Sequence, residues 1–338
     1  MDKKAISFFA VGLGVGIVIS TALFSVFVRQ MKNRDSGSSV VLKLSHGLEP
    51  THPVHKGMVK MAERMLELSG NTVKIEIYPS GQLGSEAENL NQIQNGGLDM
   101  AKVSAAPLEG FVPEMTVFSI PYVFRDHDHF WKVLEGPIGQ KMLLTGASKG
   151  LHGICYYDSG SRNFYTVSKP ILTPDDLKGQ KIRVQNSKTA IEMIKVLGGS
   201  PTPLSWGELY TSLQQKAVDG AENNPPSFYT NRHYEVCKHF SLTEHTRIPD
   251  LLVISEATWM KLSPQVQVWL KQAAEESVLY QRQLWKEETD KDLAECEKMG
   301  VTIYKPDLKP FIEKAKPMYQ QYEGTAIGKL IQEIGAVQ

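Results

Sequence analysis

From Val40 onward, short apolar runs alternate with segments of helical periodicity, and this alternation limits the possible folds more than any other feature. Val40–Ser45 and Val73–Tyr78 have the composition and alternation of β-strands. Pro53–Leu68 has the spacing of an amphipathic helix, and Glu86–Asn95 is a shorter helix that two glycines end. Leu98–Ser104 is a third strand. This β-α-β-α-β order predicts a parallel sheet with helices on both faces.

The same rhythm returns further along the chain. Strands are predicted at Gly153–Tyr157, Asn163–Val167 and Lys181–Val184, and helices at Lys188–Leu197 and Trp206–Gln215. No long linker separates the two parts. The sequence therefore predicts an α/β fold of two lobes joined by crossing strands, an arrangement that suits a binding cleft between the lobes.

The tail has a different composition. Pro264–Lys298 is nearly free of glycine and rich in Ala, Glu, Gln, Leu and Lys, with Ser263 before it and Gly300 after it. This pattern predicts one long helix. At about 1.5 Å per residue such a helix is about 45–50 Å long, enough to span both lobes.

The first 39 residues differ from the rest. Ala5 to Val28 contains no charged residue and is long enough to cross a bilayer as a helix. Lys3 and Lys4 precede this run, as in a secretory signal, yet the run is long for a cleaved signal. A signal peptide and an uncleaved membrane anchor both remain open, and the polar residues 29–39 suit a tether in either case. Both alternatives predict export.

Composition and motifs exclude several functions. Lys+Arg and Asp+Glu are both 37 of 338 residues, so the chain lacks the excess of basic residues expected of a nucleic-acid-binding protein. It has no Walker, H-E-x-x-H or C-x-x-C motif, so we expect neither an enzyme nor a cofactor. His46, His52 and His55 lack the further ligands of a metal site.

Two arginines and an asparagine pair are candidate binding residues. Arg162 lies at a strand entry, and Arg183 alternates with Ile182 on a strand, so these two side chains point to opposite faces. A guanidinium suits a carboxylate because it donates two parallel hydrogen bonds, but the pattern alone favours a solvated outer face for Arg183. Asn223 and Asn224 offer amide groups on a loop fixed by two prolines, although ordinary turn chemistry also explains them.

Several motifs together resemble one family. They are Tyr78–Gly84 (YPSGQLG), Gly179–Val184 (GQKIRV), Gly198–Pro203 (GGSPTP) and Val218–Asn223 (VDGAEN). Their order and spacing resemble the DctP-type substrate-binding proteins of tripartite ATP-independent periplasmic (TRAP) transporters over essentially all of residues 40–338. The resemblance implies a two-lobed periplasmic-binding-protein fold, a hinge, and a long C-terminal helix across both lobes. The lobes expected from it are 40–159 with 249–288 (lobe I) and 160–248 with 289–338 (lobe II).

The resemblance also implies roles for single residues. Arg183 matches the family's main carboxylate clamp, and Arg162 and Asn223 match residues of its sialic-acid branch. Trp206 falls where that branch has an aromatic residue against the ligand, and His46 matches a polar contact from the first lobe. Ser104 stands where the branch has an acidic residue, which makes sialic acid less suitable.

Three further segments of the sequence favour a sugar acid as the ligand. SGSRNFYT, VQNSKTA and AENNPPSFYT resemble segments of members that take uronates such as glucuronate or galacturonate. A hexuronate needs one clamp and several hydroxyl partners, for which we expect Asn223, Asn224, His46 and Glu86, with Trp206 or Phe228 covering a sugar face. A C4-dicarboxylate or another organic acid is the alternative ligand.

The resemblance further implies a periplasmic protein that delivers its ligand to the small and large membrane subunits of a permease. The N-terminal segment would anchor it to the inner membrane if uncleaved. Two rival functions remain, an extracytoplasmic sensor and a sugar-acid lyase or hydrolase. The first would need a signalling segment and the second a base–nucleophile pair, and the sequence shows neither.

Overall fold

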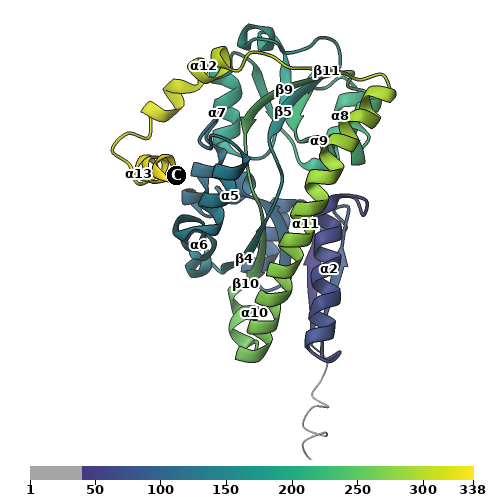
Figure 1. The fold of residues 1–338 in the computed structure, drawn as a ribbon, viewed down its shortest axis with the longest axis vertical. Coiled ribbons are helices and arrows are strands. Elements are labelled where there is room, and N and C mark those ends of the chain that lie inside the picture. The colour runs from purple at the N-terminus through teal and green to yellow at the C-terminus, as the bar shows by residue number, and fades with distance from the viewer. Residues whose placement is uncertain (1–39) are drawn as a thin grey trace, which may run out of the picture.

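The computed structural model describes residues 40–338, so the predicted signal peptide or anchor lies outside the described residues. The chain forms two α/β lobes, each built on its own sheet, as the sequence predicts (Figure 1). We call the lobe that contains β1 lobe I and the other lobe II. No helix in the described part of the chain is long and apolar enough to span a bilayer.

The sheet of lobe I has the strand order β2-β1-β3-β10-β4. The first three strands run parallel, as their β-α-β-α-β order predicts. β10 runs antiparallel between β3 and β4, which the sequence did not predict because most of lobe II separates β10 from β4 in the chain. The bounds are β1 (Val40–Ser45), β2 (Val73–Tyr78), β3 (Met100–Ser104), β4 (Leu151–Tyr157) and β10 (Asp250–Ser255).

The sheet of lobe II is also mixed, with the order β11-β9-β5-β8-β6-β7. β6 is parallel to β7 and β8, whereas β5 is antiparallel to β8 and β9. The bounds are β5 (Arg162–Thr166), β6 (Lys181–Val184), β7 (Ser200–Pro203), β8 (Gly220–Asn223), β9 (His239–Thr246) and β11 (Thr302–Tyr304).

Helices cover both sheets. Several start at a serine, threonine, aspartate or asparagine whose side chain accepts a hydrogen bond from the first turn, as in α3, α5, α7, α9 and α11. The α-helices are α2 (Pro53–Leu68), α3 (Glu86–Gln94), α4 (Ala105–Leu108), α5 (His127–Glu135), α6 (Pro137–Leu144), α7 (Lys188–Leu197), α8 (Trp206–Gln214), α9 (Pro225–Thr230), α10 (Glu256–Lys261), α11 (Pro264–Lys298), α12 (Lys309–Gln320) and α13 (Ala326–Ala336). The 3₁₀ turns are η1 (Pro113–Ser119), η2 (Ala147–Lys149), η3 (Pro174–Leu177) and η4 (His233–Glu235).

Four connections join the lobes, and the last of them is the turn between α12 and α13. The chain crosses between β4 and β5 and again between β9 and β10. The third connection is α11, which has the bounds predicted from the sequence and contacts α2 and β4 in lobe I and α9 and β11 in lobe II (Figure 1). Gly160 lies in the first crossing with φ +57°, and a Cβ there would come within 2.8 Å of the Trp285 indole nitrogen. Glycine is therefore required where the chain enters lobe II.

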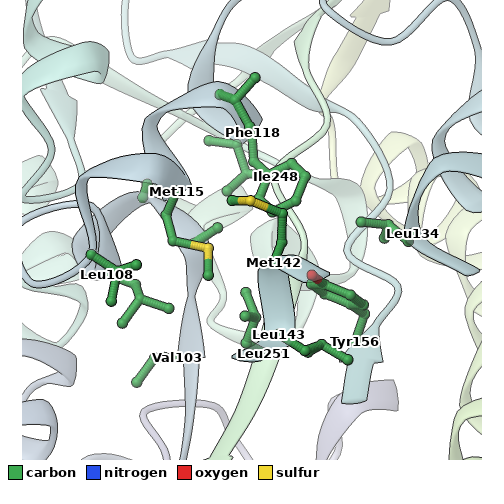
Figure 2. Packing of buried hydrophobic residues seen from close by; sticks show 14 of the residues in the cluster. Val103, Leu108, Met115, Phe118, Leu134, Met142, Leu143, Tyr156, Ile248 and Leu251 are labelled. Carbon is green, nitrogen blue, oxygen red and sulfur yellow. The ribbon is translucent and has the colours of Figure 1, made fainter. Parts of the chain in front are cut away.

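The C-terminal segment corrects one expected boundary. α12 packs on α7 in lobe II, but α13 returns to lobe I and contacts η1. Leu330 and Ile334 of α13 join the apolar core that Figure 2 shows around Met115, Phe118 and Tyr156. The assignment of residues 289–338 wholly to lobe II is thus wrong for α13. The sequence of this helix shows a short apolar stripe, but it does not indicate which lobe the stripe packs against.

One carboxylate on α11 predicts a pH dependence of stability. Asp292 is 4% exposed and its Oδ2 has no hydrogen-bond partner. Burial, and next the charge of Glu288, raise the pKa of Asp292 to about 7. The folded protein therefore holds a proton that the unfolded chain releases above about pH 4, so this group's contribution to stability falls as the pH rises towards 7.

We expect Asp292→Asn to increase the free energy of unfolding by about 1–3 kcal/mol at pH 8 and by less at pH 5, measured by urea denaturation. Asp290→Asn, on the exposed face of the same helix, is the control and should change little at either pH. An equal effect of Asp292→Asn at both pH values would contradict the assignment of the proton to this group.

Candidate ligand-binding site

A cavity of about 260 Å³ lies between the lobes. Lobe I contributes the β1–α2 loop, the start of α3, and β3, and lobe II contributes the ends of β6 and β8 and the start of α8. Seven of the predicted site residues line it: Glu86, Ser104, Arg162, Arg183, Trp206, Asn223 and Asn224.

Arg183 presents an unpaired donor to this cavity. The side chain is 2% exposed, so the alternative of a solvated outer face is wrong, while Ile182 points into the core as the alternation predicts. Nε and Nη2 both donate to the Leu204 carbonyl, at 3.0 and 2.8 Å. Nη1 is buried without a partner. Burial lowers the pKa of Arg183, but a guanidinium remains charged, so the cation lacks an anion.

Trp206 covers the same cation. Its ring centroid lies 5.7 Å from the guanidinium carbon of Arg183, within the range of a cation–π contact. The indole Nε1 is also buried without a hydrogen-bond acceptor. Two unpaired donors beside one cavity are what a site for an oxygen-rich anion requires, because buried donors without partners cost free energy until a ligand satisfies them.

Arg162 differs because its charge is already paired. Its Nε and Nη2 donate to the two carboxylate oxygens of Glu222, and Nη1 donates to Asn223 Oδ1 at 2.8 Å. Burial opposes ionisation of Glu222, but the charge of Arg162, with His245 Nε2 at 3.5 Å, outweighs it and holds the pKa of Glu222 at about 2. Asn223 Oδ1 also accepts from the Asn224 backbone, which leaves the Asn223 amide nitrogen free to donate.

A second charged group lies on the lobe I side. Lys102 Nζ is 3.1 Å from Glu86 Oε1 and 3.2 Å from Asp250 Oδ1, and all three side chains line the cavity. Burial opposes the charge of Lys102, but Asp250 and Glu86 outweigh it and raise the pKa of Lys102. Burial also raises the pKa of Asp250. The group offers carboxylate oxygens that can accept hydrogen bonds from hydroxyl groups.

The family model of the bacterial extracellular solute-binding proteins, family 7 (DctP), matches residues 44–325. The chain belongs to this family. A TRAP periplasmic solute-binding protein of Xanthobacter autotrophicus Py2 with bound β-D-galacturonate is 37% identical, has a TM-score of 0.85, and covers 88% of this chain and 100% of its own. One from Chromohalobacter salexigens with bound D-glucuronate is 32% identical, with a TM-score of 0.85 and the same coverage. The C4-dicarboxylate-binding periplasmic protein DctP of Rhodobacter capsulatus is 32% identical over 78% of this chain and 80% of its own.

Proteins of this family and its structural neighbours are solute-binding proteins rather than enzymes. This agrees with the motifs of the chain, and among residues 40–338 no group of three or more His, Cys, Asp or Glu side chains could hold a metal ion. The three cysteines of this DctP-family protein are buried free thiols.

Two predicted contacts are not found. His46 is buried outside the cavity, where Nε2 lies 3.0 Å from His55 Nδ1 and Nδ1 accepts from the Leu48 backbone. Burial, and next the charge of Lys102, lower the pKa of His46 to about 2, so the ring is neutral and supports the loop that lines the cavity. Phe228 is wholly buried and packs against Tyr165 and Phe240 in the core of lobe II.

Sequence reasoning missed Lys102 and Asp250. Each is the one charged residue of a buried strand, Lys102 within β3 and Asp250 at the start of β10. Charged side chains are rarely buried unless they are paired, so a lone charge within a buried strand was an available signal for a functional group.

Proposed function

We propose that this protein is the substrate-binding component of a TRAP transporter and captures a sugar acid with one carboxylate, a hexuronate such as glucuronate or galacturonate. The observation that carries the proposal is the buried Arg183 guanidinium, whose Nη1 has no partner and whose charge has no anion. A ligand carboxylate would supply the hydrogen-bond acceptor for Nη1 and the anion for the charge.

The rest of the cavity supports a polyhydroxylated ligand. Asn223 has a free amide donor, and Glu86 and Asp250 present acceptor oxygens on the other side. These groups fit sugar hydroxyls, which donate and accept hydrogen bonds. The bound galacturonate and glucuronate in similar proteins give independent support.

A C4-dicarboxylate is the second candidate, favoured by the similarity to the Rhodobacter capsulatus protein. Its second carboxylate would approach Glu86 and Asp250, whose charges exceed the single charge of Lys102 between them. Like charges at such distances repel, so this ligand fits the cavity less well than a uronate.

A thermal-shift series tests the proposal. D-glucuronate, D-galacturonate, D-erythronate, succinate and D-glucose are compared at equal concentration, with isothermal calorimetry on those that act. We expect the uronates to raise Tm by several degrees, succinate by less, and D-glucose, which lacks the carboxylate, not at all. NMR should recover the uronate unchanged after incubation. A larger shift with succinate than with either uronate would overturn the ligand assignment.

The delivery step follows from the family. We propose that the protein works in the periplasm and that its closed, loaded form docks on the small and large membrane subunits of a TRAP permease. Uptake of labelled glucuronate by cells that carry the permease should require this protein, and uptake that persists after its deletion would contradict the proposed role.

A further inference from the structure

Glu109 of lobe I binds the start of a helix in lobe II. Its carboxylate accepts two hydrogen bonds from Thr189, one from the backbone nitrogen at 3.1 Å and one from Oγ1 at 2.9 Å. Glu109 directly follows α4, and Thr189 lies in the first turn of α7. Both side chains are buried, at 7% and 3% exposure, although neither lines the cavity.

The contact satisfies a helix end across the two lobes. The Ser187 side chain accepts from the Ala190 backbone within α7, while the neighbouring backbone N–H of Thr189 has its partner in lobe I. A carboxylate is favourable at this position because the first turn of a helix carries free N–H groups and partial positive charge. The contact joins one lobe to the other in a structure in which residues of both lobes line the cavity, so separating the two segments that meet here would break it.

Both segments that meet here also form walls of the cavity. Ser104 and Pro107 line it a few residues before Glu109, and Gln185 and Asn186 line it a few residues before Thr189. The hydroxyl of Ser104 also lies 3.5 Å from Gln185 Oε1. When this contact forms, it therefore brings the lobe I wall and the lobe II wall of the cavity into position at the same time.

We propose that Glu109 and Thr189 form an inter-lobe clasp, a pair of positioning residues that sets how long the ligand is retained without touching it. The proposal rests on the proposed function for its ligand. Breaking the clasp favours the open form, so the ligand leaves faster, whereas association, which starts from the open form, is little affected.

We expect Glu109→Gln to raise the Kd for D-glucuronate about tenfold, because charge-assisted hydrogen bonds contribute more than neutral ones and glutamine keeps one acceptor. Stopped-flow measurements should place this change in the dissociation rate and leave the association rate within about twofold. Thr189→Val should act in the same direction. The double variant should lose no more affinity for D-glucuronate than the weaker-binding single variant, because both substitutions break the same contact.

Asp176→Asn is the matched control. Asp176 accepts from the Leu172 and Thr173 backbones at a turn that lies wholly within lobe II, so its loss should leave the Kd unchanged. A Kd within twofold of wild type for Glu109→Gln, or effects that multiply in the double variant, would overturn the clasp. An equal rise in Kd for Asp176→Asn would assign the effect to general loss of helix caps.

A ligand-independent measurement separates this proposal from the choice of ligand. Spin labels attached after Lys74→Cys in lobe I and Lys178→Cys in lobe II report the inter-lobe distance, and the native cysteines are buried. Glu109→Gln should deplete the short-distance population in the absence of ligand. If no uronate binds the wild type, the proposed ligand fails, whereas an unchanged distance distribution would refute the clasp.

Discussion

Replacing Arg183 by alanine is expected to weaken uronate binding by about 2–5 kcal/mol, the largest effect on affinity in the molecule. The variant would leave the ligand carboxylate in a closed cavity without a cation, since Arg162 is paired with Glu222 and Lys102 with two carboxylates. Isothermal calorimetry with D-glucuronate measures the change. Arg183→Lys should also lower the affinity for D-glucuronate more than about tenfold. Lysine lacks the planar guanidinium, which can donate to the Leu204 carbonyl and to the ligand at the same time.

Arg64→Ala provides the control, since this arginine pairs with Glu67 and Glu276 on helices away from the cavity. The Kd of Arg64→Ala for D-glucuronate should equal that of the wild type. The stability of the ligand-free protein should not fall in Arg183→Ala, because the variant removes a buried cation that has no anion. A Kd for Arg183→Ala within tenfold of the wild type would contradict the role of Arg183 as the main clamp.

Replacing Lys102 by methionine is expected to have the largest effect on stability, a loss of about 3–5 kcal/mol at pH 7. The lysine is 4% exposed and lies between Glu86 and Asp250, which the variant leaves as two neighbouring carboxylates with no cation. The pKa of Asp250, which burial already raises, would then rise further above that of the unfolded chain. As the pH falls, the folded variant would bind a proton at a higher pH than the unfolded variant does. The loss of stability relative to the wild type should therefore be smaller at pH 5 than at pH 7.

Urea denaturation at the two pH values measures this difference. Lys43→Met is the matched control, because this lysine lies on β1 of the same sheet but its side chain is exposed. It should change the free energy of unfolding by less than about 0.5 kcal/mol. A loss below about 1 kcal/mol for Lys102→Met would show that the ion group does not hold the cavity wall.

The local parts of the fold could be predicted because each carries its own periodicity. The strand and helix alternation after Val40 gave the parallel half of the first sheet, and the glycine-poor run gave α11 with its observed bounds. The antiparallel insertion of β10 and the return of α13 to lobe I depend on contacts between distant segments, for which a periodic pattern contains no signal.

The candidate site shows the same division. Strand alternation and the family motif together indicated Arg183, but no pattern indicated that, of these two arginines, Arg162 is paired with Glu222 and Arg183 lacks an anion. The structure places His46 and Phe228 outside the lining of the cavity, because His46 lies against His55 and Phe228 packs in the core of lobe II. Pairing and burial are properties of the folded chain, so they had to come from the structure.

A crystal structure of the D-glucuronate complex tests the central claim most directly. We expect a carboxylate oxygen of the ligand at about 2.7–2.9 Å from Arg183 Nη1, with the sugar hydroxyls turned towards Asn223 and the Glu86–Lys102–Asp250 group. A ligand whose carboxylate lies against Lys102 or in solvent, with Nη1 of Arg183 still unpaired, would contradict the account.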